Sequence, residues 1–216
     1  HSFLEDFAAT PPASPPPPDC ILWANRGGGK TFLGAVATAL DLLYKPGIQI
    51  RILGGSLEQS QRMHAHLTTL FQIPLLQSHI AGKVTQRRLR LSNRSGAEIL
   101  AQSQASVRGT RVQKIRCDEV ELFDPRVWEA AQLATRSAFC GKTLVRGAIE
   151  CLSTMHMPHG IMARLVDEAR AGRRALFKWG VVDVLAHCGN NHICGTPTPP
   201  PPPPPAPGDL RIAEIH

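Results

Sequence analysis

Short apolar runs alternate along the chain with longer segments whose apolar residues recur at the helical spacing of three and four. The expected strands cover residues 20–24, 48–55, 112–119, 143–152 and 175–182. The expected helices cover residues 31–44, 56–71, a segment that follows Pro125, and 160–171. Pro46 and Gly47 end the first helix, and Ser56 caps the second. This alternation indicates an α/β domain with a largely parallel central sheet flanked by helices.

One segment interrupts the alternation, because residues 84–101 have the pattern of a hairpin that turns at Asn93–Gly96. The hairpin concentrates four arginines, Arg87, Arg88, Arg90 and Arg94. Two interpretations stay open. The arginines contact the backbone of a nucleic acid, or they only protect an edge strand from aggregation.

Proline is concentrated in two tracts that set the expected domain boundaries. Residues 11–18 read "PPASPPPP" and residues 199–205 are seven consecutive prolines, and neither tract can form a helix or a central strand. We therefore divide the chain into a Pro-rich lead-in (1–19), one folded domain (20–187) and a Cys/His segment with a polyproline tail (188–216).

Composition indicates which kind of partner and which cellular compartment the chain suits. The 216-residue chain has a formal charge of +7, which suits a polyanionic partner such as nucleic acid. No apolar run approaches the length of a membrane span, and the first residues lack the pattern of a secretory signal, so we expect no membrane association. Six scattered cysteines, three of them inside apolar runs, favour a reducing, cytoplasmic compartment.

The segment between the first strand and the first helix is rich in glycine. Its candidate ligand-binding residues are Asn25, Arg26, Gly27, Gly28, Gly29, Lys30 and Thr31. In such a loop the backbone N–H groups surround a phosphate, and the helix dipole adds to the attraction. Lys30 would reach the outer phosphates of ATP, and the Thr31 hydroxyl would coordinate Mg²⁺. The full phosphate-binding pattern has glycine where this chain has Ala24, so a glycine-rich turn without a ligand is the alternative.

Two adjacent acids end the strand expected at residues 112–119. A loop that hydrolyses a nucleotide needs an acid beside the Mg²⁺ ion and usually a second acid that orients water. We therefore expect Asp118 to coordinate Mg²⁺ through water and Glu119 to act as the catalytic base.

Four segments together resemble the ATPase domain of phage terminase large subunits, the motors that package viral DNA. They are "LWANRGGGKT", "ILGGSLEQSQRM", "SVRGTRVQKIRCDEVELFDPRVWEAA" and "CLSTMHMPHGIM". The resemblance spans residues 20–187 and implies a P-loop NTPase fold of the ASCE-like class. It implies that Arg26 is the early arginine of a deviant Walker A motif, with a part in catalysis, and that Asp118 and Glu119 form the Walker B motif.

The resemblance assigns two further motifs. The segment around Gln59 is similar to the helicase-like second motif of the family. Ser153 and Thr154 match the motif that contacts the nucleotide and couples hydrolysis to movement. The residues alone leave an alternative, because a hydroxyl pair ahead of "MPHGIMARL" can also cap a helix.

The resemblance also implies partners. Terminase large subunits use ATP and Mg²⁺ to translocate double-stranded DNA, as ring homo-oligomers with a portal and a terminase small subunit. A phage or prophage encodes them, and they act in the bacterial host cytoplasm. The nine residues after the proline tract hold too few acids for a two-metal nuclease, so we expect no nuclease activity from this chain. The alternatives are a helicase-like P-loop ATPase acting on DNA and a degenerate prophage remnant that binds nucleic acid without turnover.

Three other groups of residues have open interpretations. Arg108 and Arg111 contact phosphates or DNA, or they lie in a solvated turn. His187, Cys188, His192 and Cys194 are soft ligands for Zn²⁺, although their spacing fits no common zinc pattern. The pairs His64 and His66, and His156 and His159, are expected to be solvated or capping histidines.

Overall fold

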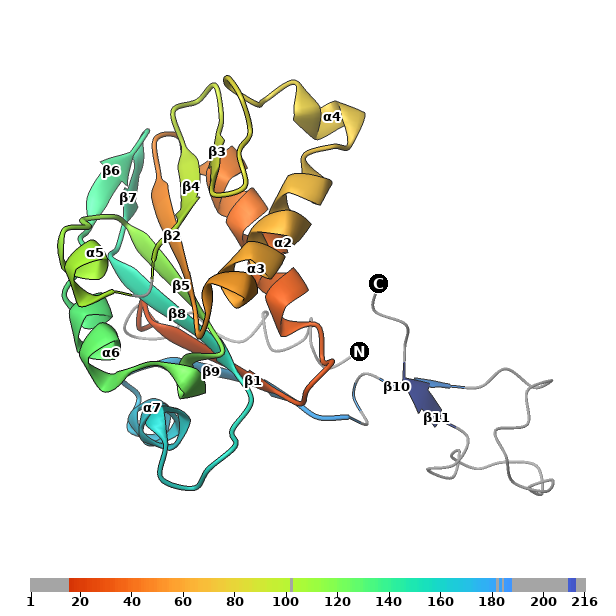
Figure 1. Ribbon diagram of the computed structural model, residues 1–216, viewed down its shortest axis with the longest axis vertical. Coiled ribbons are helices and arrows are strands. Elements are labelled where there is room, and N and C mark those ends of the chain that lie inside the picture. The colour runs from red at the N-terminus through yellow and green to blue at the C-terminus, as the bar shows by residue number, and fades with distance from the viewer. Residues whose placement is uncertain (1–15, 102, 182, 184, 188–209, 213–216) are drawn as a thin grey trace.

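The computed structural model describes residues 16–101, 103–181, 183, 185–187 and 210–212. A seven-stranded sheet runs through the domain in the order β3-β4-β2-β5-β8-β1-β9 (Figure 1). Its strands are β1 Cys20–Ala24, β2 Gln49–Gly54, β3 Arg88–Arg90, β4 Gly96–Ile99, β5 Lys114–Asp118, β8 Ala148–Ser153 and β9 Ala175–Trp179. Neighbouring strands are parallel except at the edge, where β3 is antiparallel to β4. The expected α/β fold with a largely parallel sheet is confirmed.

Helices cover both faces of the sheet (Figure 1). On one face lie α2 (Lys30–Tyr44) and α3 (Leu57–Leu70), whose Leu42 and Met63 belong to the same buried cluster as Ile50 and Ile52 of β2. The other face is covered by α5 (Gln104–Arg108), α6 (Pro125–Gln132) and α7 (Ile161–Arg170). Burial of apolar side chains on both faces is the main stabilisation of such a sheet.

The helix boundaries follow the expected signals. Ser56 caps α3, because its side-chain oxygen accepts a hydrogen bond of 3.2 Å from the backbone nitrogen of Gln59. Pro125 is the first residue of α6. Three short helices have no periodic apolar pattern and were not predicted: α4 (Pro74–Gln77), α5 and the 3₁₀ helix η1 (Val120–Leu122).

The single strand expected at residues 143–152 is wrong. The structure has a separate hairpin, β6 (Ala138–Cys140) paired with β7 (Thr143–Val145), before β8 joins the main sheet. Gly147 lies between β7 and β8. A Cβ atom at this position would lie only 2.9 Å from the carbonyl carbon of Arg136. That close approach of two backbones needs glycine. The short pair β10 (Leu185–His187) and β11 (Leu210–Ile212) is antiparallel.

A buried network of charged side chains joins α2 to the strands β5 and β8. Arg116 of β5 is 1% exposed and pairs with Asp41 of α2 and Glu150 of β8. Its guanidinium also donates to the Thr38 hydroxyl at 2.9 Å. Lys114 pairs with both carboxylates as well, at 2.9 Å from Asp41. The network therefore fixes α2 against β5 and β8, the elements whose other ends carry the candidate site.

Two further findings bear on the sequence predictions. His64 is 2% exposed, so its expected solvation is wrong, and burial lowers its pKa. Within the described residues, no helix has the length and apolar character needed to cross a bilayer.

Candidate functional site

The glycine loop lies between β1 and α2, where the carboxyl ends of the parallel strands meet. Gly27 and Gly29 have φ angles of 74° and 75°, in the left-handed region that favours glycine. A Cβ on Gly28 would lie 3.0 Å from the Asn25 carbonyl oxygen and 3.0 Å from the indole nitrogen of Trp179. The glycines are therefore required by the backbone path and by close packing.

Trp179 holds the loop from the end of β9. Its indole N–H donates a hydrogen bond of 2.7 Å to the carbonyl oxygen of Gly28. This contact was not predicted, although a polar-tipped aromatic at the carboxyl end of a parallel strand is a detectable signal. The neighbouring Lys178 lies over the ring of Trp23, 4.3 Å from its centroid.

Lys30 is central to the site. Its ammonium is 2.9 Å from the Asn25 carbonyl oxygen, 2.9 Å from the Thr154 hydroxyl and 3.9 Å from a Glu119 carboxylate oxygen. Burial lowers its pKa, and the charges of Glu119 and Asp118 act in the opposite direction. One cation thus links the loop, the acid pair and the hydroxyl pair.

Asp118 ends β5 directly opposite the first turn of α2. The Thr31 hydroxyl donates a hydrogen bond of 3.0 Å to Oδ2 of Asp118. The pKa of Asp118 is raised to about 6, mainly by burial. The hydrogen bond from Thr31 and the charge of Lys30 lower this pKa, whereas the charge of Glu119 raises it. Its other oxygen, Oδ1, is buried without a hydrogen-bond partner among the described residues. A carboxylate with a free oxygen beside a hydroxyl fits a hard cation such as Mg²⁺, so these residues suit the expected metal.

Glu119 follows in a left-handed conformation, with φ at 53°. That conformation is uncommon for a residue other than glycine and is typical of functional positions. Its carboxylate accepts a hydrogen bond of 3.4 Å from the Ser153 hydroxyl and is 23% exposed. Glu119 therefore reaches Lys30 and Ser153 at once, from a strained backbone position.

Ser153 and Thr154 lie beside the acids, at the end of β8. Their alternative interpretation as a helix cap is wrong, because α7 begins eight residues after Ser153 and its N-cap is Gly160. The cap contact comes from Glu121, whose Oε2 accepts a hydrogen bond of 2.8 Å from the backbone nitrogen of Met162. No local sequence signal joins Glu121 to a helix that starts forty positions later.

The remaining expected residues differ in their distance from the acids. Gln59 lies close to the acids. Both Oε1 of Gln59 and the carbonyl oxygen of Glu119 would contact a Cβ atom added to Gly55. Arg26 is exposed, and its guanidinium has no hydrogen bond or ion pair within the described part of the chain. Arg108, in α5, and Arg111 are also exposed. The possible zinc ligands Cys188, His192 and Cys194 lie outside the described residues.

No protein-family model matches the sequence, and no curated protein matches it significantly. Solved structures of phage large terminases do match the fold. The large terminase of bacteriophage HK97 is 15% identical, with a TM-score of 0.62 over 86% of this chain and 38% of that chain. The large terminase of the thermophilic bacteriophage D6E is 13% identical, with a TM-score of 0.59 over 77% of this chain and 42% of that chain.

Structures of the D6E terminase in complex with ADP and with ATP-gamma-S are also similar, with TM-scores of 0.56 and 0.53. This chain spans about two fifths of the length of the first two terminases. The described domain therefore shares its fold with part of these large terminases.

Proposed function

We propose that the chain is the ATP-hydrolysing domain of a phage terminase large subunit, coupling hydrolysis of Mg-ATP to translocation of double-stranded DNA. One observation carries the ATPase part. Two hydrogen bonds join α2 to neighbouring strands, Lys30 to Thr154 and Thr31 to Asp118, and bring the loop, the acids and the hydroxyl pair within one site. A glycine-rich turn without a ligand has no need of this convergence.

The residues divide into three roles. The backbone N–H groups of residues 25–31 and the start of α2 bind the phosphates, and Lys30 neutralises their charge. Thr31 and Asp118 hold Mg²⁺, which supplies further charge neutralisation when it is bound. Arg26, at the exposed edge of the loop, adds a positive charge beside the outer phosphate.

Glu119 acts as the base that orients and polarises the attacking water. Its 3.4 Å hydrogen bond from Ser153 and its distance of 3.9 Å from Lys30 support this role, because both contacts fix the carboxylate. Among the described residues, the Thr154 hydroxyl donates to no acid, and it accepts a hydrogen bond from Lys30. We infer that Ser153 and Thr154 respond to loss of the outer phosphate and pass the change to β8.

The motor part of the proposal rests on the fold. Packaging motors of this type move double-stranded DNA, and we propose a homo-oligomeric ring that works with a portal and a terminase small subunit in the bacterial host cytoplasm. The similarity of the D6E complexes with ADP and ATP-gamma-S supports ATP as the nucleotide. The formal charge of +7 is compatible with a DNA partner.

Turnover of the Glu119→Gln variant tests the proposed function. Loss of the base should lower the ATPase rate on the order of 100-fold or more, while Mg-ATP binding is kept. The control is Glu129→Gln, since Glu129 is an exposed glutamate on α6. ATPase activity should increase with double-stranded DNA and be absent in Lys30→Ala. Normal turnover in Glu119→Gln would contradict the assignment, and unwinding of duplex DNA would indicate a helicase instead.

A further inference from the structure

At one edge of the sheet, two strands carry arginines on the same face, and the strand between them carries a glutamate. Side chains alternate along a strand, and Ile50, Ile52 and Leu89 are buried on the face covered by α2 and α3. Arg51 of β2, Glu98 of β4 and Arg88 of β3 therefore lie on the opposite face. They are also in register, since Arg51 is paired with Glu98 and Glu98 with Arg88.

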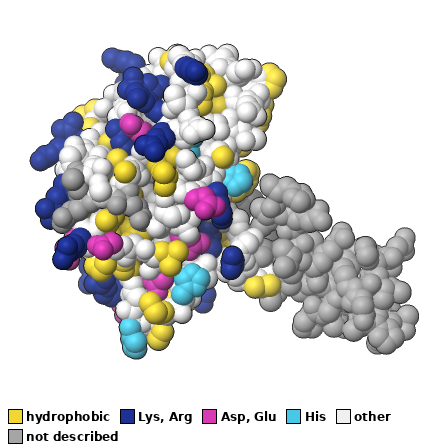
Figure 2. All heavy atoms as spheres, viewed as in Figure 1, with side chains coloured by type: hydrophobic (Ala, Val, Ile, Leu, Met, Phe, Trp, Pro, Cys, Tyr) yellow, Lys and Arg dark blue, Asp and Glu magenta, His cyan; other side chains and the backbone are white. Residues whose placement is uncertain are grey.

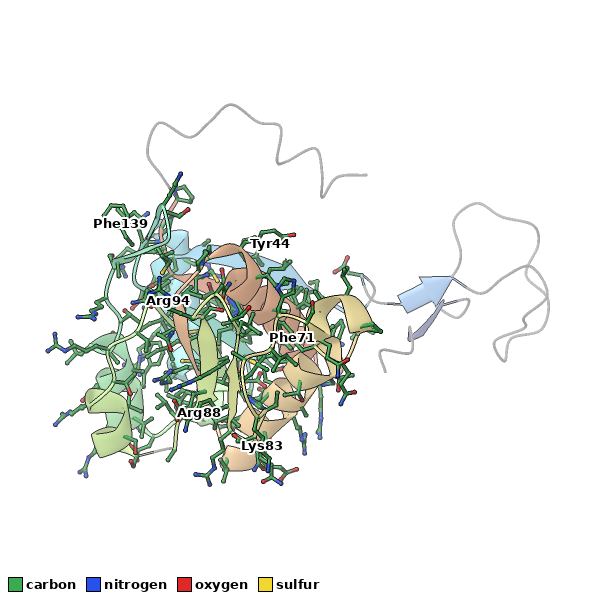
Figure 3. All side chains as sticks on the ribbon, turned by 90° about the horizontal axis from the view of Figure 1, so that it is seen from above. Tyr44, Phe71, Lys83, Arg88, Arg94 and Phe139 are labelled. Atoms are coloured by element: carbon green, nitrogen blue, oxygen red, sulfur yellow. The ribbon has the colours of Figure 1, made fainter. Side chains whose placement is uncertain are left out.

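Further arginines extend this row. Arg90 follows Arg88 on the same face of β3, about 6.6 Å farther along the strand. Arg94 lies in the turn between β3 and β4, and Arg87 directly precedes β3. We call Arg51, Arg87, Arg88, Arg90 and Arg94 the arginine face. Figure 2 shows dark blue side chains gathered where Figure 1 places β3 and β4, and Figure 3 labels Arg88 and Arg94.

The positive charge of the arginine face is poorly neutralised. Glu98 pairs with Arg51 at 3.4 Å. The other four arginines are exposed, and none forms an ion pair with a carboxylate in the part of the chain that the structure describes. Burial lowers the pKa of Arg51; Glu98 raises it, and the charges of Arg88 and Arg90 lower it further. The cations therefore repel one another, and an external polyanion would relieve that repulsion.

Protection of a sheet edge does not explain the arrangement. Charges on an edge strand such as β3 do discourage pairing with another chain. Arg51, however, is on the inner strand β2, with its side chain 20% exposed. A half-buried cation on an inner strand has no effect on the edge, so edge protection does not account for Arg51, which pairs with Glu98 and extends the positive face inward from β3.

The surface of the arginine face suits phosphates. One hollow of about 440 Å³ is lined by Arg87, Arg88, Glu98 and neighbouring polar residues. A second, of about 340 Å³, is lined by Arg90, Arg94 and residues of the adjoining turn. Neither hollow has an aromatic side chain on which an unpaired base could stack. These features favour the backbone of a duplex over a single strand.

We propose that the arginine face binds the phosphate backbone of double-stranded DNA. The inference deepens the proposed function by naming the surface that holds the DNA, and it does not depend on ATP turnover. Contacts of this kind are independent of base sequence.

Duplex binding by the full chain, measured by fluorescence anisotropy over a range of salt concentrations, tests the proposal. The variant Arg88→Ala/Arg90→Ala removes two phosphate contacts, so the slope of log K against log salt should become less negative by about 1.8. At 0.1 M salt the affinity should fall on the order of 50-fold. Arg88→Lys/Arg90→Lys keeps both charges and should keep the slope.

The matched control is Arg126→Ala/Arg164→Ala. It removes the same net charge from exposed positions on α6 and α7, and α7 packs against β1 and β9 at the other side of the sheet. Its slope should stay that of the unmodified chain. Glu98→Gln should act in the opposite direction and tighten binding several-fold, a result that misfolding cannot produce.

Equal slopes for the two alanine pairs would overturn the proposal, and so would weaker binding by Glu98→Gln. Competition by polyglutamate at the same charge concentration as DNA would overturn it in favour of an acidic protein partner. The assay is performed without nucleotide and repeated with Lys30→Ala. Lys30→Ala should bind the duplex as the unmodified chain does. If the unmodified chain itself binds the duplex normally but does not hydrolyse ATP, the proposed function is rejected and the arginine face is kept.

Discussion

Replacement of Asp41 by asparagine tests whether the buried charge network stabilises the fold. Burial alone raises the pKa of Asp41, but Arg116, Lys114 and a hydrogen bond from Lys45 outweigh it and hold the pKa at about 2. The ordinary value is 3.8. This difference corresponds to about 2–3 kcal/mol of stability, because each pKa unit is worth about 1.4 kcal/mol.

The sign of the pH dependence follows from the lowered pKa. The stabilisation is full above the unfolded-state pKa near 4 and is lost as the pH falls toward 2. Asp41→Asn should therefore reduce the free energy of unfolding by about 2–3 kcal/mol at pH 7 and by about half of that at pH 3. Urea unfolding at several pH values measures this difference.

Asp167→Asn is the matched control for this experiment. Asp167 pairs with Arg170 at 3.1 Å, but its side chain is 70% exposed. Its replacement should change the free energy of unfolding by no more than about 0.5 kcal/mol at any pH. Equal losses in the two variants at pH 7, or a loss for Asp41→Asn that is the same at pH 3 and pH 7, would show that the ionised Asp41 does not stabilise the fold.

Two further variants test the packing around the site. Gly28→Ala should weaken Mg-ATP binding by about tenfold or more, because the new methyl group meets Asn25 and displaces Trp179. Titration with a fluorescent ATP analogue measures this affinity, and an unchanged value would contradict the described loop. Glu121→Ala should reduce the free energy of unfolding by about 1–2 kcal/mol, because the backbone nitrogen of Met162 loses its acceptor. Urea unfolding measures this loss, and an unchanged midpoint would show that the contact between Glu121 and α7 does not stabilise the fold.

Local patterns predicted the parts of the fold that local physics determines. The strand at Cys20–Ala24, the glycine loop and the Ser56 cap depend on neighbouring residues, and all three are where the sequence placed them. The acids at the end of β5 were recognised because they follow an apolar run. Their contact with Thr31 could be expected only from the general rule that parallel strands end at one edge of a sheet.

Long-range contacts could not be predicted in the same way. Arg116 lies in the strand expected at residues 112–119, but its partners Asp41 and Glu150 are 75 and 34 positions away. The break at Gly147 depends on the backbone of Arg136, which no periodicity reveals. Trp179 meets the glycine loop 151 positions earlier. Each of these contacts depends on the order of strands in the sheet, which a single sequence does not encode locally.

The central claim is that residues 25–31 surround the phosphates of ATP within reach of Asp118 and Glu119. Isothermal titration of the full chain with ATP and Mg²⁺ tests it most directly, with Lys30→Ala and Asp118→Asn as paired variants. We expect the unmodified chain to bind Mg-ATP, Lys30→Ala to bind it at least about tenfold more weakly, and Asp118→Asn to lose the Mg²⁺ dependence. No binding by the unmodified chain, or equal binding by Lys30→Ala, would contradict it.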